Sequence, residues 1–137
     1  MTVRQTLEAG SPFDIYKSVL TEKYADFTGR ARRAEYWWFV LINFVVIFSL
    51  VVLIIILVGS NDSLAGLGGI IYAVYALGVF VPSLAVTVRR LHDTNKSGWM
   101  LLIGLIPIVG PILLLVFYFT DGDLGTNRFG PSPKYVS

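Results

Sequence analysis

The chain has 137 residues, of which 55% are hydrophobic and only 15% are charged. A soluble domain usually carries roughly a quarter charged residues, so this composition excludes a water-soluble monomer and indicates a small integral membrane protein. The formal net charge of +2 does not indicate nucleic-acid binding, and the absence of cysteine excludes disulfides, thiolate metal sites and cysteine nucleophiles.

Residues 1–35 form a polar N-terminal segment that contains one amphipathic stretch. Apolar side chains recur there at every third or fourth position, which predicts a helix with one apolar face; they are Phe13, Tyr16, Val19, Leu20, Tyr24 and Phe27. Ser11 followed by Pro12 is a favourable helix start, and Gly29 is expected to end the helix. Such a helix either lies on the cytoplasmic membrane surface or docks on the chain's own helices.

Residues 36–119 form the predicted membrane domain, with hydrophobic blocks at 36–58, 64–88 and 99–119. Each block is long enough for the ~20 helical residues that a bilayer core requires, and none alternates with the period of two that barrel strands show. The sequence therefore predicts an all-α integral membrane protein. We expect a small helical bundle with about three transmembrane segments plus the N-terminal amphipathic helix. Residues 120–137 form a polar, turn-rich tail.

The second block has two features that bear on packing. Ala65, Gly69 and Ala73 recur at every fourth position, which is typical of a face that lets another helix approach closely. Pro82 has no amide hydrogen for the carbonyl of Gly78, so we expect a kink there.

The third block is ambiguous because it contains Pro107, Gly110 and Pro111. It forms either one kinked crossing or two short halves that dip into the membrane and return. Neither half is long enough to cross alone. The hydrophobic length of the whole block favours the single crossing.

The basic residues indicate the orientation. Six precede the first block, three lie between the second and third, two follow the third, and none lies between the first and second. Short loops rich in Lys and Arg stay in the cytoplasm, so the N-terminus and the loop 89–98 are expected inside and the turn 59–63 outside. A third block that returned would keep all eleven inside. The side of the C-terminus stays open.

Two basic clusters fall on the predicted cytoplasmic side. The first contains Arg30, Arg32, Arg33 and Glu35, and the second contains Arg89, Arg90, His92 and Asp93. Arginines next to a membrane attract anionic lipid, or they fix the topology by reaching the headgroups. The two acids do little for orientation. They are explained by an ion-pair network that closes this end of the bundle, for instance between Glu35 and Arg89 or Arg90.

A catalytic reading of His92 and Asp93 is weak, because adjacent residues on a helix point in different directions. One histidine without cysteine does not make a typical zinc site. The run 121–127 lacks the glycine spacing and terminal Glu of a calcium loop. We therefore assign no catalytic residue, no cofactor and no metal ligand.

Three segments carry a resemblance to a known family: 24–39, with Thr28-Gly29-Arg30-Ala31-Arg32-Arg33-Ala34-Glu35 at its centre, 89–99, and 125–131. Together they resemble the bacterial inner-membrane family called domain of unknown function 805. The resemblance implies a small multi-pass protein of the bacterial inner membrane without an established activity. Its polar signature also adds Asn127 to the candidate cluster, as if the three segments met. If they meet, the third block must turn back.

The leading functional hypothesis is a non-enzymatic membrane binding or assembly protein. Its cytoplasmic arginines would engage anionic lipid headgroups or a partner, with Glu35 and Asp93 ordering them. The alternative is a subunit of a transporter or channel, assembled as a homo-oligomer through the face of Ala65, Gly69 and Ala73. A third hypothesis is an enzyme acting on lipid headgroups through His92 and Asp93.

Overall fold

The computed structural model describes residues 11–133, so the predicted segments 1–35 and 120–137 lie partly outside the described residues. The elements are α2 (Pro12–Leu20), α3 (Arg33–Ser60), α4 (Asp62–Asp93), the 3-10 helix η1 (Gly98–Leu105) and α5 (Val109–Phe119). Within this part of the chain the β structure is a single isolated bridge between Asn127 and Gly130. The predicted all-helical class is confirmed.

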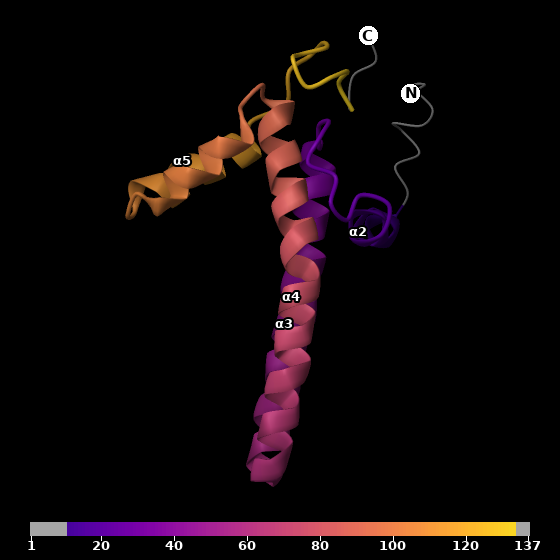
Figure 1. Ribbon diagram of the computed structural model, residues 1–137, viewed down its shortest axis with the longest axis vertical. Helices are drawn as coiled ribbons and strands as arrows, with labels where there is room; N and C mark the ends of the chain where they lie inside the picture. Colours follow the sequence, from indigo (N-terminus) through magenta and orange to yellow (C-terminus); the bar gives the residue numbers. More distant parts are fainter. Residues whose placement is uncertain (1–10, 134–137) are drawn as a thin grey trace.

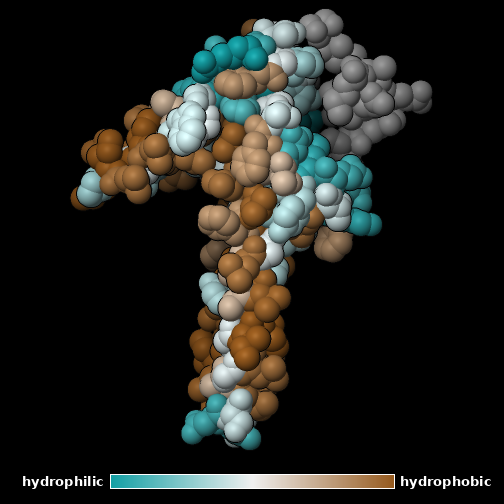
Figure 2. Space-filling model, viewed as in Figure 1, coloured by the Kyte–Doolittle hydropathy of each residue, from teal (hydrophilic) through white to brown (hydrophobic). Residues whose placement is uncertain are grey.

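Helices α3 and α4 form a long antiparallel pair (Figure 1). The chain reverses at Asn61, whose side-chain oxygen accepts a hydrogen bond from the Ser63 amide at 2.9 Å and so caps α4. Both helices are long and apolar enough to cross a membrane. Their outer faces stay uncovered by the chain; Leu77, for example, is 75% exposed. Figure 2 shows this apolar surface along the stem that α3 and α4 form. Lipid or another apolar partner suits such a surface.

The close approach between α3 and α4 occurs at Gly68. A Cβ atom there would lie 2.9 Å from Cγ1 of Ile54, whereas a Cβ on Gly69 would meet nothing within 4 Å. The predicted small-residue face of Ala65, Gly69 and Ala73 is therefore not the seam between these two helices. Its suggested role in oligomer assembly stays a prediction.

Helix α2 begins as predicted and ends early. Ser11 accepts from the Asp14 amide, and the Asp14 carboxylate accepts from the Ser11 amide, which completes a capping box. The helix ends at Leu20 rather than near Gly29, and a run of turns follows. Tyr16 stacks on Phe39 with ring centroids 5.4 Å apart. Helix α2 is therefore docked on the chain's own helices, which is one of the two predicted placements.

Tyrosines of α2 and of the segment after it form hydrogen bonds with polar atoms of the α3–α4 pair. The Tyr16 hydroxyl lies 2.8 Å from that of Tyr75, which donates to Asn43 at 2.6 Å. The Tyr24 hydroxyl donates to the carbonyl of Gly78 at 2.8 Å. This is the carbonyl that Pro82 leaves without an amide partner, and α4 continues through Pro82 as one helix.

The third hydrophobic block folds back on itself. η1 and α5 are joined by a tight turn at Pro107 and Ile108, where Ile108 has a φ of 67°. The two halves pack so closely that a Cβ on Gly110 would collide with the carbonyl of Ile103. The carbonyl of Tyr118, near the end of α5, accepts from Arg90 at the end of α4, beside the start of η1. The block is therefore two short halves that start and end at the same end of the molecule, rather than the single continuous helix that its hydrophobic length favours.

The contact at Gly68 is testable by comparing it with its neighbour. We expect Gly68→Leu to lower the free energy of unfolding by about 1–3 kcal/mol, since the side chain must push Ile54 and α3 away. Gly69→Leu, which adds the same atoms into open space, should have little effect. Thermal unfolding in detergent measures both. Equal losses would contradict this assignment of the seam and would point to a contact between copies at Gly69.

Candidate functional site

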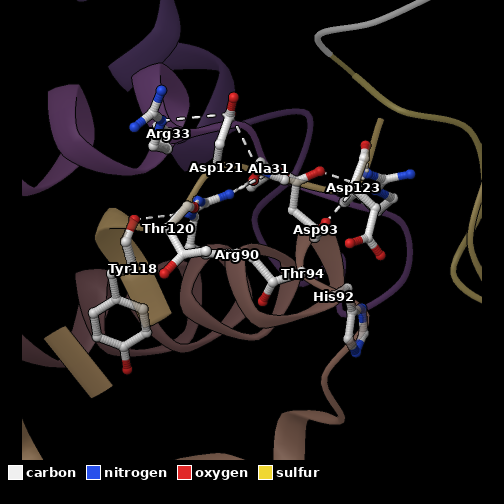
Figure 3. Close-up of polar contacts among 12 residues, drawn as sticks. Ala31, Arg33, Arg90, His92, Asp93, Thr94, Tyr118, Thr120, Asp121 and Asp123 are labelled. Atoms are coloured by element: carbon white, nitrogen blue, oxygen red, sulfur yellow. Dashed lines mark hydrogen bonds and ion pairs between the residues drawn. The ribbon is translucent and has the colours of Figure 1, made fainter. Parts of the chain in front are cut away.

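Three polar segments meet at one end of the molecule (Figure 3). They are the loop before α3, the last turn of α4, and the tail that follows α5. Helix α4 extends past the apolar block to Asp93, so Arg89, Arg90, His92 and Asp93 stand on a helix rather than in the loop expected at 89–98. The Ala31 amide donates to the carbonyl of Arg89 at 2.9 Å and fixes the loop against this helix end.

Arg30 binds the tail to the end of α4. Its Nε donates to Oδ1 of Asp93 at 2.9 Å. The remaining donors reach backbone carbonyls: Nη1 those of Gly125 and Gly130, and Nη2 those of Asp93 and Asp123. The side chain is fully enclosed, and all three of its nitrogens have partners. A neutral or shorter side chain would leave these acceptors unpaired.

Arg90 joins the same carboxylate to the end of α5. Its Nη1 donates to Oδ2 of Asp93 at 2.6 Å and to the carbonyl of Ala31 at 3.1 Å. Its Nε donates to the carbonyl of Tyr118 at 3.0 Å, and Nη2 donates to that of Thr120. Asp93 therefore lies between two buried guanidinium groups, one on each oxygen. The Asp93 backbone carbonyl also accepts from the Asp123 amide at 2.8 Å.

Arg89 forms the second buried pair, with Glu35. Its Nη1 lies 2.5 Å from Oε1 of Glu35, which also accepts from Lys23 at 3.1 Å. Of the two partners expected for Glu35, Arg89 and Arg90, the structure shows Arg89. Arg89 Nε donates to the carbonyl of Asp26 at 3.0 Å. Arg89 Nη2 is buried and has no hydrogen-bond partner among the described residues.

The Asp26 carboxylate holds the loop at this point. Burial raises the pKa of Asp26, but hydrogen bonds from the hydroxyl and amide of Thr28 outweigh that effect, and its pKa lies below the ordinary value. Asp26 is therefore ionised at neutral pH. Its charge adds to that of Glu35 in balancing Lys23 and Arg89.

His92 and Asp93 do not form a pair. His92 Nδ1 lies 2.9 Å from the carbonyl of Gly29, and its ring stacks on Phe129 with centroids 3.8 Å apart. Asn127 donates from Nδ2 to the His92 carbonyl at 2.9 Å. His92 and Asn127 thus hold the tail against α4, while Asp93 faces the two arginines. This arrangement offers no carboxylate to orient the imidazole for acid–base work.

Two of the predicted arginines lie toward the surface. Arg33 is 45% exposed and pairs with Asp121 at 3.5 Å, and it also donates to the carbonyl of Phe119 at 3.1 Å. Arg32 is half-buried at the N-cap of α3. Arg30, Arg89 and Arg90 are buried and bonded within the chain. Of the five arginines expected at lipid headgroups, these three are therefore corrected to residues bonded within the chain, and the expectation stays a prediction for Arg32 and Arg33.

Several partners in this network are invisible to a search for functional side chains. The carbonyls of Ala31, Tyr118 and Thr120 accept from Arg90, and any residue type supplies a carbonyl. Gly122 is needed because a Cβ atom there would collide with the Asp93 carboxylate. Across residues 11–133, no group of three or more His, Asp or Glu side chains is placed to hold a metal ion.

The structure defines a class of protein: a pair of exposed apolar helices long enough to cross a membrane, with a buried arginine network at one end. The chain belongs to the family described as "Protein of unknown function (DUF805)", which matches residues 24–131. That range contains Arg30, Arg89 and Arg90 with their acidic partners Glu35 and Asp93, whereas Lys23, the other cation bonded to Glu35, lies one residue before it. The family resemblance inferred from the three polar segments is confirmed.

Curated relatives agree with this class. The chain is 46% identical over 121 residues to the "Inner membrane protein YhaH" of Escherichia coli strain K12, covering 88% of this chain and 97% of that protein. It is 44% identical over 122 residues to the "Inner membrane protein YhaI" of the same strain, covering 89% of this chain and 97% of that protein. No solved structure matches the chain.

The network predicts a large difference between two aspartates. We expect Asp93→Asn to lower the free energy of unfolding by about 3–5 kcal/mol, because it leaves two buried guanidinium groups without their shared charge. Asp121→Asn removes a longer, surface pair with Arg33 and should cost about 1 kcal/mol or less. Thermal unfolding in detergent measures both. Similar values for the two variants would contradict a central role for Asp93.

Proposed function

We propose that this protein is a non-enzymatic, multi-pass membrane protein that binds anionic lipid at the cytoplasmic leaflet. The observation that carries the proposal is the separation of charge along the molecule. The described Lys and Arg residues stand on α2, on the loops and tail at the network end, or on the helix ends beside them: Lys17, Lys23, Arg30, Arg32, Arg33, Arg89, Arg90, Lys96 and Arg128. The opposite turn carries Asp62 and no basic residue.

This separation supports an orientation with the network end in the cytoplasm, since short basic segments stay inside. The returning third block then places the tail on the same side as the N-terminal loop. All eleven basic residues of the sequence lie in the cytoplasm in this arrangement. The conflict between a single crossing and a meeting of the three polar segments disappears, because the block returns.

Arg32 and Arg33 are suited to lipid headgroups for an electrostatic reason. They stand at the N-terminus of α3, where the helix dipole is positive and basic side chains are unfavourable. Glu35 in the first turn is engaged by Lys23 and Arg89, and Asp121 pairs with Arg33. An anionic headgroup beside these arginines would add negative charge at the positive end of the helix dipole.

The buried arginines act through structure in this proposal. Replacing Arg89 and Arg90 would disturb the packing of the loop, the tail and α5, so a loss of lipid in such variants would not identify a headgroup contact. Arg32 and Arg33 are the informative positions. The alternative of a transporter or channel has little support from the polar side chains of the spans. Asn43 and Tyr75 bond to each other, and Thr87 bonds to the Ser83 carbonyl.

The orientation predicts where a reporter at the end of the chain lies. We expect a fluorescent protein fused after Ser137 to fluoresce and an alkaline phosphatase fused there to be inactive, because both sit in the cytoplasm. Alkaline phosphatase inserted after Ser60 serves as the control and should be active. An active phosphatase after Ser137 would overturn the returning third block.

The headgroup contact predicts a change in lipid preference. We expect Arg32→Gln together with Arg33→Gln to lower the preference for phosphatidylglycerol over phosphatidylcholine by about fivefold per charge removed, because a basic residue near an anionic surface contributes about 1 kcal/mol. The matched double variant with Lys at both positions should keep the preference. Mass spectrometry of lipid retained from mixed vesicles measures it, and an unchanged ratio in the Gln variant contradicts the proposal.

A further inference from the structure

The molecule is wide at one end and narrow at the other. Beside the arginine network, the cross-section contains parts of α2, α3, α4, η1 and α5, whereas beyond them only α3 and α4 continue (Figure 1). Helix α2 docks on α3 through Tyr16 and Phe39, and the hairpin of η1 and α5 leaves the opposite side of the pair at a large angle. The width therefore differs between the two halves of the membrane-spanning stem.

The hairpin of η1 and α5 is short compared with a bilayer. Helix α5 has 11 residues and spans about 16 Å, roughly half of the ~30 Å hydrocarbon core. Arg33 and Trp37 of α3 and Arg90 of α4 hold its final residues by their backbone carbonyls. With its root fixed at the polar end, the hairpin tip cannot reach the far interface.

The surface of the hairpin is apolar and uncovered. Trp99 and Leu105 are each 79% exposed and Ile108 is 78% exposed, and neither η1 nor α5 carries a charged residue. A surface of this kind is not stable in water or among headgroups. Trp99, at the root, has the amphipathic ring that favours the interface. The fixed root, the length and the apolar composition together match the acyl chains of a single leaflet.

We propose that the η1–α5 hairpin is a one-leaflet wedge, whose partner is the acyl-chain region of the leaflet next to the arginine network. The wedge widens that leaflet and leaves the other unchanged, so the protein favours membrane that bends with its cytoplasmic face convex. The proposal rests on the proposed topology and is independent of the anionic headgroup contact. For this reason its tests use zwitterionic phosphatidylcholine, in which the charge preference of Arg32 and Arg33 plays no part.

Depth measurements test the placement of the hairpin. The chain has no cysteine, so single spin labels are introduced cleanly by Leu105→Cys, Ser60→Cys and Leu124→Cys. We expect the label at the hairpin tip, on residue 105, to be reached by oxygen and not by a water-soluble nickel chelate. The other two labels should be reached by the chelate, from opposite sides of sealed vesicles. A label at 105 that the chelate reaches, or that both reagents miss because a second copy covers it, overturns the proposal.

Orientation in vesicles of different size tests the wedge itself. The outer leaflet of a small vesicle is expanded. In small sonicated vesicles we therefore expect molecules with the wide end outward to outnumber those with the wide end inward about threefold, a ratio that corresponds to roughly 0.65 kcal/mol. In large extruded vesicles the two orientations should be nearly equal. Tryptic cleavage of the tail at Arg128 counts the outward-facing molecules.

Two matched variants separate the wedge from other causes. Leu105→Lys places a charge at the tip. A charged side chain is unfavourable in the hydrocarbon core, so the hairpin should leave it and the threefold dependence on vesicle size should disappear. Leu124→Lys makes the same change on the exposed tail, outside the hairpin, and should leave the dependence intact. Equal orientation in small and large vesicles for the unaltered protein, or equal behaviour of the two variants, overturns the wedge.

Discussion

The fold depends on the carboxylate of Asp93 between two buried guanidinium groups. Removing a charge from water is costly, and two arginines are tolerated inside the bundle end only because each oxygen of Asp93 faces one of them and backbone carbonyls take the remaining donors. Those carbonyls come from three segments far apart in the chain. The requirement to satisfy Arg30 and Arg90 therefore dictates that the loop before α3, the end of α4 and the tail lie together.

The path of the third hydrophobic block follows from the same requirement. The carbonyls of Tyr118 and Thr120, at the end of α5, are acceptors for Arg90, so the chain must return to the place from which η1 departs. The tight turn at Pro107 and Ile108 and the contact of Gly110 with Ile103 make that return short. A hydrophobic block of crossing length is thereby held as a hairpin, which gives the molecule unequal width at its two ends.

The arginines differ in burial, so the positions of the charges in the sequence do not show which arginines are available to a ligand. Arg30, Arg89 and Arg90 are saturated or enclosed within the chain, and Arg32 and Arg33 lie toward the surface at a helix start. A buried ion pair adds little net stability over a well-packed apolar group, but the loss of one partner is strongly destabilising. In the proposed function, surface cations and apolar helices contact the membrane. His92 holds the tail through Gly29 and Phe129.

The sequence by itself determined the features that depend on residue type and local spacing. These are the membrane-length apolar helices, the helix start at Ser11 and Pro12, the pairing of Glu35 with one of the two arginines Arg89 and Arg90, and the family to which the chain belongs. Only the tertiary structure decided that the third block returns, that α2 stops at Leu20 and docks through Tyr16, and which arginines are buried. Their acceptors are mainly backbone carbonyls, which every residue carries, so residue identities do not reveal which carbonyls a guanidinium group will meet until the segments are packed.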